Sequence, residues 1–557
     1  MTDSGTDSQT GKRSSYYLTT PIYYVNDVPH LGTAYTTIAA DAMARFRRMQ
    51  GHDVWFLTGL DEHGTKVAKA AAENDMTPQD WVDHLEPAFV EAWKMLNITY
   101  DVFMRTTAPE HKAAVQKMAS VLHENGDIYA GDYTGWYCVP DENYWNESDI
   151  KMPEGADGHP DGAGGVPVPV CPDCQRPLEF VQEKNWFFKL SKYTDFLIDY
   201  YESNPQAMGP ETRRNEVLSF LRSGLHDLSI SRADVDWGIP LPWTEGASEA
   251  DGGEQTMYVW FDALINYMTA VGYGADEGDA AAAEEYRYRW PAQVHYVGKD
   301  IIRFHCIIWP AMLYAAGLPL PKTVFAHGFL NIDGKKMSKS LGNAVTPASL
   351  VERFGVDGYR YYFLRDVTFG NDGNISDDAM VARFNGDLAN DWGNLVSRLF
   401  SMVGKYCDGI VPAYVGDMTA DGAEGAVLRD IADGLYARVT EHMDAFDYGG
   451  ALNAVWDLVR ASNRYLEDSA PWGLAKDAEK ADDLARVLYS TLEACRVVAL
   501  YSAFVMPETS DEVMARLGLG PATTCVDLKR AGEWGQLPAG NTVTKGDPLF
   551  QRMETGK

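Results

Sequence analysis

The sequence predicts an α/β fold built on a parallel sheet, with an insertion inside it and an all-α domain after it. Residues 16–20 read as a strand of aromatic and β-branched side chains, and residues 53–58 read as a second strand. Between them, Ile38, Ala42 and Phe46 fall on one helical face, which completes a strand–loop–helix–strand unit. From about residue 345 the chain becomes mainly helical, which indicates a helix bundle.

Length and composition favour a globular protein of several domains. The chain has 557 residues, of which 45% are hydrophobic and 12% aromatic. Residues 1–14 are polar and are expected to form a disordered tail without a signal peptide. The apolar segments 306–319 and 497–507 are short and are interrupted or ended by proline, so no membrane span is expected. Seven cysteines, an odd number, favour a reducing compartment and therefore the cytoplasm.

The charge of the chain argues against a nucleic-acid partner. The formal net charge is −32 at pH 7, and an acidic body repels RNA at long range. Two explanations would reconcile this charge with an RNA partner. One is a local basic face hidden in the average, and the other is adaptation to high salt, which screens the repulsion.

The first strand leads into a candidate phosphate site. Residues 21–29 read as a loop, and His30 and Gly32 follow where the predicted helix begins. A helix N-terminus with a nearby imidazole and a glycine for close approach suits an anion. Taken alone, His30 would be interpreted as a buried or capping histidine.

A second candidate phosphate site lies about 300 residues further along the chain. Residues 333–343 read DGKKMSKSLGN, with three lysines and two serines in the first eight positions. The sequence has turn chemistry at both ends, so we expect a surface loop. Its lysines could close over a polyphosphate and neutralise charge on the leaving oxygens. A solvated lysine-rich turn is the better interpretation of this loop alone, but two such sites together favour phosphate binding.

These two segments resemble the HIGH and KMSKS signatures of class I aminoacyl-tRNA synthetases. The surrounding sequence closely resembles the methionyl-tRNA synthetase family in the blocks PIYYVNDVPHLGTAYTT, FLTGLDEHGTKV, YVWFDALINYM and GKDIIRFHCIIWPAML. The resemblance runs from about residue 16 to about residue 507, and these blocks in this order are very specific. It implies a Rossmann-like nucleotide-binding domain with an inserted knuckle-type domain, followed by a helix bundle that binds the anticodon.

The resemblance also implies the reaction and its partners. A methionine–tRNA ligase uses ATP, with Mg²⁺, to activate L-methionine to methionyl-adenylate, and then transfers the methionyl group to tRNA(Met), including the initiator tRNA. The reaction requires no side-chain nucleophile, so catalysis rests on positioning and electrostatic stabilisation. The sequence has no room for the appended C-terminal domain that often dimerises family members, so a monomer is expected.

The resemblance assigns the ATP site to both signatures and to a glycine–lysine–aspartate segment after a predicted strand. Thr33 stands where the family has a second histidine; a hydroxyl can donate a hydrogen bond but cannot supply a cationic imidazolium. The implied catalytic residues are His30, Thr33, Lys336 and Lys339, and the implied ATP contacts are His30, Gly32, Gly298, Asp300, Lys336 and Lys339.

A stripe of large side chains at helical spacing is assigned to the methionine pocket. Trp260, Leu264 and Tyr267 would ordinarily be interpreted as core, and a pocket wall is also core. An unbranched thioether suits an aromatic, polarisable lining. The implied pocket residues are Ile22, Tyr24, Trp260, Leu264, Tyr267 and His305, with Asp61 facing the ammonium group.

The predicted insertion carries a possible zinc knuckle. A Cys-x-x-Cys segment, Cys171 to Cys174, follows Cys138 by about 30 residues, and three thiolates with one further ligand suit tetrahedral Zn²⁺. Asp141 stands where the family usually has a fourth cysteine, and His159 is a possible substitute. The alternative is a decayed knuckle without metal.

The helical part carries the implied anticodon contacts. Asn394 and Arg398 lie four residues apart on one helical face, and Trp472 lies at a helix junction. In the family such residues hold the CAU anticodon by hydrogen bonds and base stacking. The predicted domains are the catalytic halves at 15–117 and 226–325, the insertion at 118–225, a KMSKS and stem-contact region at 326–380, the anticodon-binding domain at 381–507 and a C-terminal tail at 508–557.

Three other functions are considered and disfavoured. Another class I synthetase, for leucine, valine, isoleucine or cysteine, is disfavoured by the pocket residues and by an insertion too short for a large editing domain. A silent tRNA-binding protein would be expected to have lost His30, Gly32, Lys336 or Lys339, all of which are present. A generic adenylyl- or cytidylyltransferase would lack the helix bundle.

Overall fold

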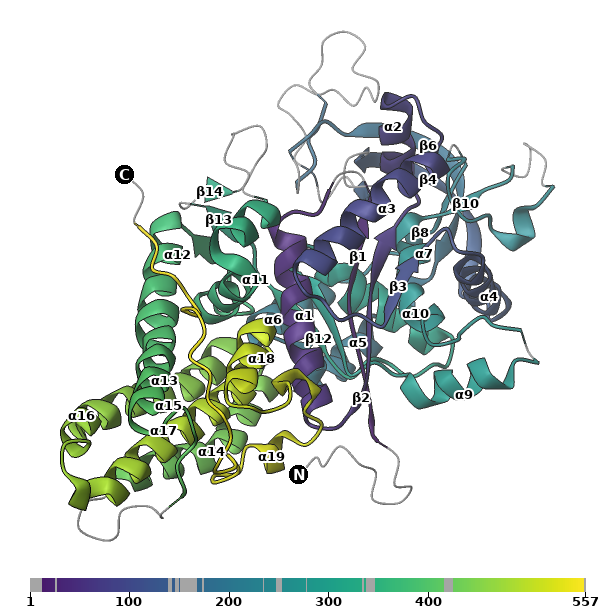
Figure 1. Ribbon diagram of the computed structural model, residues 1–557. Coiled ribbons are helices and arrows are strands. Elements are labelled where there is room, and N and C mark those ends of the chain that lie inside the picture. Colours follow the sequence, from purple (N-terminus) through teal and green to yellow (C-terminus); the bar gives the residue numbers. More distant parts are fainter. Residues whose placement is uncertain are drawn as a thin grey trace.

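The protein is described here by a computed structural model (Figure 1). The description covers residues 13–554 except for 26–27, 139–142, 146–149, 151–167, 173–174, 234, 247–252, 277, 333–334, 337–345 and 415–423. Most of the predicted tail 1–14 therefore lies outside the described residues. No helix in the part that is described combines the length and apolar character needed to cross a membrane.

A sheet of six parallel strands forms the centre of the N-terminal part. Its strand order is β3-β2-β1-β11-β12-β7, and every neighbouring pair is parallel. The predicted parallel-sheet α/β domain is therefore confirmed. The strands are β1 (Ser15–Tyr24), β2 (Asp53–Asp61), β3 (Val102–Arg105), β7 (Met208–Gly209), β11 (Val294–Gly298) and β12 (Val324–His327).

The sheet is buried on both faces, as parallel sheets usually are. Neighbouring residues of β1 point to opposite faces: Leu18 joins a core with helix α1 (Leu31–Met49), whereas Tyr17 joins a second core with α4 (Pro109–Glu124) and α10 (Trp309–Ala315). The first core also contains α3 (Pro78–Met95) and continues into the helix bundle. β1 and β2 therefore carry unbroken runs of buried residues rather than alternating buried and exposed ones.

The topology places several strand ends at one edge. β1 and β11 are neighbours although almost 300 residues separate them, which is the point where the two halves of the sheet meet. The carboxyl ends of β1, β2, β11 and β12 all lie at this edge because the strands are parallel. Open α/β sheets bind their ligands at such an edge.

The predicted insertion contains a separate antiparallel sheet. Its order is β5-β4-β6-β8, formed by β4 (Ile128–Cys138), β5 (Asn143–Trp145), β6 (Glu179–Phe188) and β8 (Leu228–Ser229). Two helices lie between β6 and β8 in the chain, α5 (Thr194–Ser203) and α6 (Glu211–Arg222). Between them, β7 leaves the insertion and pairs with β12 as the edge strand of the central sheet, so part of the range 118–225 belongs to the catalytic layer.

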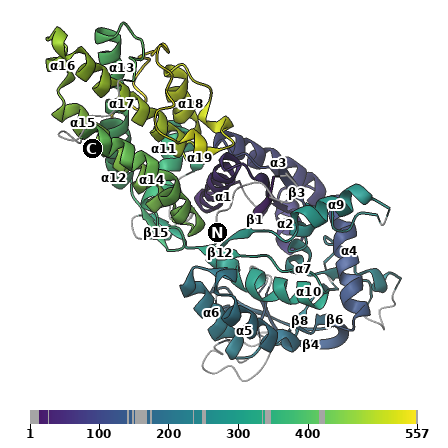
Figure 2. The same ribbon diagram turned by 90° about the horizontal axis from the view of Figure 1, so that it is seen from below.

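The C-terminal part is helical, as predicted. Helix α11 (Pro347–Asp366) leads from the sheet domain into α12 (Asp377–Arg383), α13 (Asn394–Tyr406), α14 (Glu424–Asp444), α15 (Tyr448–Asp468) and α17 (Ala481–Ser502). The bundle extends to one side of the sheet domain (Figure 2). The short helix α16 (Pro471–Leu474) lies near the end of the bundle that points away from the sheet (Figures 1 and 2).

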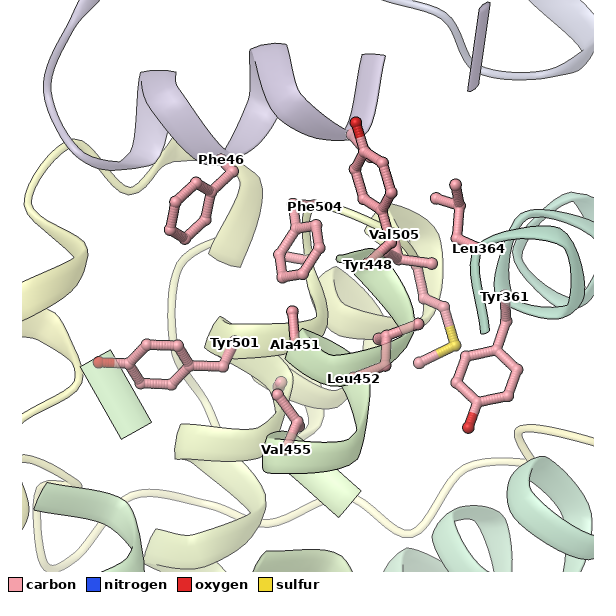
Figure 3. Close-up of a cluster of buried hydrophobic side chains, with 14 of the residues drawn as sticks. Phe46, Tyr361, Leu364, Tyr448, Ala451, Leu452, Val455, Tyr501, Phe504 and Val505 are labelled. Atoms are coloured by element: carbon pink, nitrogen blue, oxygen red, sulfur yellow. The ribbon is translucent and has the colours of Figure 1, made fainter. Parts of the chain in front are cut away.

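Helix α1 joins the two parts through a buried interface (Figure 3). Phe46 of α1 packs edge-on against Phe504, with ring centroids 5.6 Å apart. The Tyr448 hydroxyl donates to the Ala39 carbonyl oxygen across 2.8 Å. Arg360 of α11 forms a fully buried ion pair with Asp41, at 2.6 Å. Removing one partner of such a pair would leave a buried charge uncompensated, so the interface favours one fixed arrangement of the two parts.

The segment predicted as a C-terminal tail, 508–557, is folded as far as residue 554. It contains most of α18 (Pro507–Arg516) and all of α19 (Leu528–Ala531). The buried carboxylate of Glu493 on α17 accepts hydrogen bonds from the backbone N–H groups of Gly535, Gln536 and Leu537. A side chain distant in sequence therefore orders a stretch that lacks a helical pattern of its own.

Candidate active site

His30 caps the helix that begins the candidate phosphate site. Its Nδ1 accepts hydrogen bonds from the backbone N–H groups of Gly32, at 3.0 Å, and Thr33, at 3.4 Å. A neutral imidazole that accepts at Nδ1 carries its proton on Nε2, so this side chain can donate to an anion while it caps the helix. The side chain is exposed at the carboxyl edge of the sheet.

The two residues after the cap are constrained by it. A Cβ atom at Gly32 would lie 3.0 Å from His30 Cε1, so a larger residue would displace the imidazole. The Thr33 hydroxyl accepts from the His30 backbone N–H at 3.0 Å and donates to the His30 carbonyl oxygen at 2.7 Å. Its single proton is therefore engaged within the capping box rather than directed outward.

The end of β11 places Gly298 and Asp300 at the same edge. The Asp300 carboxylate occupies the space that a side chain at position 298 would need, which explains the glycine. Between them, Lys299 pairs with Asp372 at 2.7 Å, and Asp372 also accepts from the backbone N–H of Phe329. These contacts tie the end of β11 to the segment that follows β12.

The lysine-rich segment begins as a hairpin beside this edge. Strand β13 (Leu330–Ile332) pairs with β14 (Lys335–Lys336) in antiparallel fashion and with β15 (Gly373–Ile375) in parallel fashion. The backbone of Lys336 lies in β14, while Lys339 lies outside the described residues. At the end of β12, His327 Nε2 lies 2.6 Å from the Thr36 hydroxyl of α1, which links this end of β12 to the helix that His30 caps.

The structure gathers most of the predicted methionine-pocket residues around one cavity. Six of the seven predicted residues line it: Ile22, Asp61, Trp260, Leu264, Tyr267 and His305. The seventh, Tyr24, lies beside Trp260 with ring centroids 6.1 Å apart. The helical stripe of the sequence is thus both core and cavity wall.

The inner end of this cavity is polar but neutral. His305 Nδ1 donates to the Ile301 carbonyl oxygen at 3.0 Å, and His305 Nε2 therefore accepts from the Tyr267 hydroxyl at 2.7 Å. Burial lowers the pKa of His305 to about 4 and raises that of Tyr267. Neither group carries charge at neutral pH, so the cavity offers a polarisable wall suited to an uncharged side chain.

The carboxyl end of β2 presents a carboxylate to the cavity. Asp61 is buried and lines the cavity. The next two residues are held elsewhere: Glu62 pairs with Arg105 at 2.6 Å, and His63 Nδ1 contacts Asp262 at 2.7 Å. Trp237 holds the backbone through Nε1, which donates to the Glu62 carbonyl oxygen.

The knuckle region brings two of the predicted zinc ligands into one cluster. Cys138 and Cys171 are both buried with Trp136, Trp145 and neighbouring apolar residues. A tight turn follows Cys171, in which the Gln175 backbone N–H donates to the Cys171 carbonyl oxygen at 2.9 Å. Asp141, His159 and Cys174 lie outside the described residues. Within the described residues no set of three or more metal-binding side chains is found.

The predicted anticodon residues lie in the outer part of the bundle. Asn394 is exposed at the start of α13. Arg398 forms a long ion pair of 3.6 Å with Glu467 near the end of α15, and Trp472 lies in α16, five residues further along the chain. The indole of Trp472 is 41% exposed, which is unusual for a large apolar side chain and leaves a face available for stacking.

Several residues of the site were missed in the sequence. Pro21, Ala263 and Asn266 also line the cavity. The buried Asp262 contacts two histidines, His63 and His111, from distant parts of the chain. The helical spacing of Ala263 with Tyr267 could have indicated the first set, but no local pattern indicates the second.

Comparisons with known proteins give a consistent result. Residues 16–400 match the family described as tRNA synthetases class I (M), and residues 415–557 match the anticodon binding domain of methionyl tRNA ligase. The chain is 45% identical to the methionine–tRNA ligase of Streptomyces coelicolor, over 100% of this chain and 99% of that one. It is also 45% identical to the corresponding ligase of Caldanaerobacter subterraneus, over 98% of this chain and 80% of that one. The solved structure of Mycobacterium tuberculosis methionyl-tRNA synthetase in complex with methionyl-adenylate is 42% identical, with a TM-score of 0.87 over 97% of this chain and 100% of that chain.

Proposed function

This chain belongs to the methionyl-tRNA synthetase family of class I aminoacyl-tRNA synthetases, and we propose on that basis how its own residues carry out the reaction. The enzyme is a methionine–tRNA ligase: it activates methionine with ATP to methionyl-adenylate and transfers the methionyl group to tRNA(Met). The tRNA partners include the initiator tRNA, and the enzyme acts in the cytoplasm, where translation takes place.

The activation step joins the methionine carboxylate to the α-phosphorus of ATP. A carboxylate oxygen forms the new P–O bond, the bond to the bridging oxygen of the β-phosphate breaks, and pyrophosphate leaves. His30 donates to the phosphates from Nε2, a role supported by its cap contacts, which keep the proton on that nitrogen. Lys336 and Lys339 neutralise the triphosphate, to which Mg²⁺ is bound, and Gly298 and Asp300 contact the adenosine.

Thr33 acts in this step through the helix rather than through a phosphate. Its hydroxyl proton is held by the His30 carbonyl oxygen, which supports a role in fixing the cap. The Gly32 and Thr33 backbone N–H groups already donate to His30 Nδ1, so this end of α1 offers a phosphate the Nε2 proton of His30.

Methionine is held by the cavity that the predicted residues share. Asp61 pairs with the ammonium group, and the side chain extends toward Tyr267 and His305, between Trp260 and Leu264. One observation carries the assignment: six predicted residues line a single cavity beside the helix that His30 caps. In the second step the terminal ribose hydroxyl of the tRNA attacks the adenylate carbonyl carbon, AMP leaves and a proton is released.

The bundle holds the anticodon through Asn394, Arg398 and Trp472. This assignment is supported by the exposure of Trp472 and by the position of all three in the outer part of the bundle. Asn394 and Arg398 supply hydrogen bonds to base edges, and Trp472 supplies a stacking face.

One structural Zn²⁺ would be held in the insertion by Cys138, Cys171, Cys174 and Asp141, with His159 as the alternative to Asp141. The burial of Cys138 and Cys171 in one small cluster supports this set. The ion would brace the knuckle as a tetrahedral centre and take no part in the reaction. Zinc content near one per chain by elemental analysis, lost in a Cys171→Ser variant but retained in Cys306→Ser, is the expected result.

The test of the function is methionine-dependent ATP–pyrophosphate exchange, run at low and high KCl. Methionine, leucine, valine, isoleucine and cysteine are compared as substrates. Exchange with methionine alone is expected. Exchange with another amino acid would overturn the assignment of the cavity but not of the fold, and no exchange at any salt with folded protein would favour a silent tRNA-binding protein.

A further inference from the structure

A buried carboxylate behind the methionine cavity connects three separate segments of the chain. Asp262 lies in α7 (Val259–Ala263) and has no exposed surface. One oxygen accepts from His63 Nδ1 at 2.7 Å, and the other accepts from His111 Nε2 at 2.8 Å. Both imidazoles are also buried. Each carboxylate oxygen thus has its own N–H donor, which is what a fully desolvated carboxylate requires.

His63, Asp262 and His111 are each connected to residues that line the cavity. His63 is two residues from Asp61. Asp262 itself lies between Trp260 and Leu264, so its carboxylate braces α7, which carries Trp260 and ends just before Leu264. His111 reaches the wall by another route, because its Nδ1 lies 3.2 Å from the hydroxyl of Thr269, two residues after Tyr267.

The charge state of Asp262 agrees with this geometry. Burial raises the pKa of its carboxyl, but His63 and His111 outweigh burial and hold the pKa below its usual value. The carboxylate is therefore ionised at neutral pH and can accept from both imidazoles.

Asp61 ends strand β2, and other contacts also hold the residues that follow it. Glu62 is held by Arg105 and by its backbone N–H, which donates to the Thr106 hydroxyl at 2.9 Å. The Gly64 backbone N–H donates to the Trp237 carbonyl oxygen at 3.0 Å. The His63–Asp262 contact is the link that joins this segment to the aromatic wall rather than to the surrounding scaffold.

We propose that Asp262 is a positioning residue for methionine: through His63 and through its own helix, it holds the Asp61 carboxylate in register with Trp260 and Leu264. This proposal rests on the assignment of Asp61 to the methionine ammonium group. A reacting or binding group misplaced by about 1 Å can cost about 100-fold, so the loss of this link should affect methionine far more than ATP.

Two substitutions at one position separate positioning from packing. His63→Asn keeps an amide N–H close to the place of imidazole Nδ1, whereas His63→Leu has nearly the same size and no donor. In ATP–pyrophosphate exchange, His63→Leu should raise the KM for methionine by about 10- to 100-fold and leave the KM for ATP within about twofold. His63→Asn should recover most of the methionine KM.

A second variant and a distant control complete the test. Asp262→Asn should also raise the methionine KM selectively, because its amide nitrogen faces an imidazole N–H. The control is Glu493→Gln, which alters another fully buried carboxylate, one that orders the C-terminal segment far from the cavity. It should lower the melting temperature without changing either KM.

The outcomes divide cleanly. Two results would overturn the proposal. One is an equal methionine KM in the two His63 variants. The other is a rise of the methionine KM and the ATP KM together, accompanied by a loss of melting temperature like that expected for Glu493→Gln. Wild-type enzyme assayed alongside tests the proposed function separately, since exchange with methionine must be present there whatever the variants do.

Discussion

The proposed methionine cavity and the proposed anticodon site at the outer end of the helix bundle are built under opposite constraints. At the cavity, Asp61, Tyr267 and His305 are each at most 2% exposed, and the Tyr267 hydroxyl donates to His305 Nε2. At the end of the bundle, Trp472 is 41% exposed, and Arg398 makes a long ion pair of 3.6 Å with the exposed Glu467 of α15. The first site is built before its ligand arrives, whereas the second presents side chains that a ligand can order.

This difference follows from the ligands. Methionine is small, and one methylene contributes little binding energy, so discrimination has to come from fixed geometry in an enclosed space. An anticodon offers three bases with large flat faces, so exposed side chains gain enough by stacking to compensate for being ordered. Substitutions in the cavity should therefore disturb both binding and folding, while substitutions at the end of the bundle should disturb tRNA binding alone.

The largest expected effect is the loss of the cavity's carboxylate. Asp61→Asn leaves the methionine ammonium group without its counter-charge in a buried site, which costs about 2–5 kcal/mol, or about 30-fold to several thousand-fold in kcat/KM for methionine. Steady-state ATP–pyrophosphate exchange measures it. tRNA binding, followed by filter retention, should be unchanged.

The matched control for Asp61→Asn is Asp83→Asn. Asp83 is a half-exposed partner of Arg105 on the same side of the domain, and its exchange kinetics should equal those of the wild type. If the two variants behaved alike, Asp61 would not face the ammonium group.

The next effect tests the other half of the comparison. Trp472→Ala removes one stacking face, worth about 1–3 kcal/mol, and should lower kcat/KM for tRNA(Met) in aminoacylation by about 10- to 100-fold. Exchange without tRNA and the melting temperature should stay at wild-type values because the indole is half-exposed. Tyr314→Ala, an exposed aromatic on the sheet domain, serves as the control. A fall in exchange would show that the bundle end is coupled to the cavity.

The sequence predicted the two sites to different degrees for the same physical reason. Local sequence patterns are enough to predict the strands, the helices and the helix cap. For the cap, His30 and its partners lie within three residues of one another. The cavity wall could also be found, since Trp260, Leu264 and Tyr267 recur at helical spacing in the sequence and line one cavity in the structure. What the pattern lacks is long-range pairing: His63 and Asp262 are 199 residues apart, and a buried Asp between large apolar residues resembles an ordinary core position.

The folded C-terminal segment was missed for a related reason. The ordered structure of this segment depends on Glu493, which accepts hydrogen bonds from backbone N–H groups 42 to 44 residues further along the chain. Likewise β7, with only two residues, reads as loop and becomes a strand because β12 offers it an edge. Such segments are fixed by partners rather than by propensity.

Acid should weaken the cavity side of the molecule. Burial keeps His305 neutral in the folded chain down to a pKa of about 4, whereas the unfolded chain takes up a proton on this residue below about pH 6.5. The unfolded state then binds more protons, so stability is full above about pH 6.5 and falls as the pH is lowered toward 4, by about 2 kcal/mol at pH 5. Burial lowers the pKa of His295 and His327 as well, which adds to the loss in the same direction.

Thermal unfolding at pH 7, 6 and 5 measures this loss. His305→Gln should flatten the dependence, whereas His442→Gln, at a partly exposed histidine of the bundle, should leave it unchanged. A flat wild-type profile across this window would mean that His305 is not buried in its neutral form.

The smallest expected effect is that of salt. It should differ between the two sites, because salt screens the long-range field of the whole molecule but hardly screens a buried contact. Raising KCl from about 0.1 M to about 1 M shortens the screening length from about 10 Å to about 3 Å. The methionine KM should stay within about twofold, because the Asp61 contact lies inside the protein, where salt screens little. A net charge of −32 repels tRNA at long range, so kcat/KM for tRNA should rise as the first part of this increase in KCl removes the repulsion. A steady fall instead, as counterion release predicts for a basic binding surface, would show that a local basic face dominates the encounter and that the acidity lies elsewhere on the molecule.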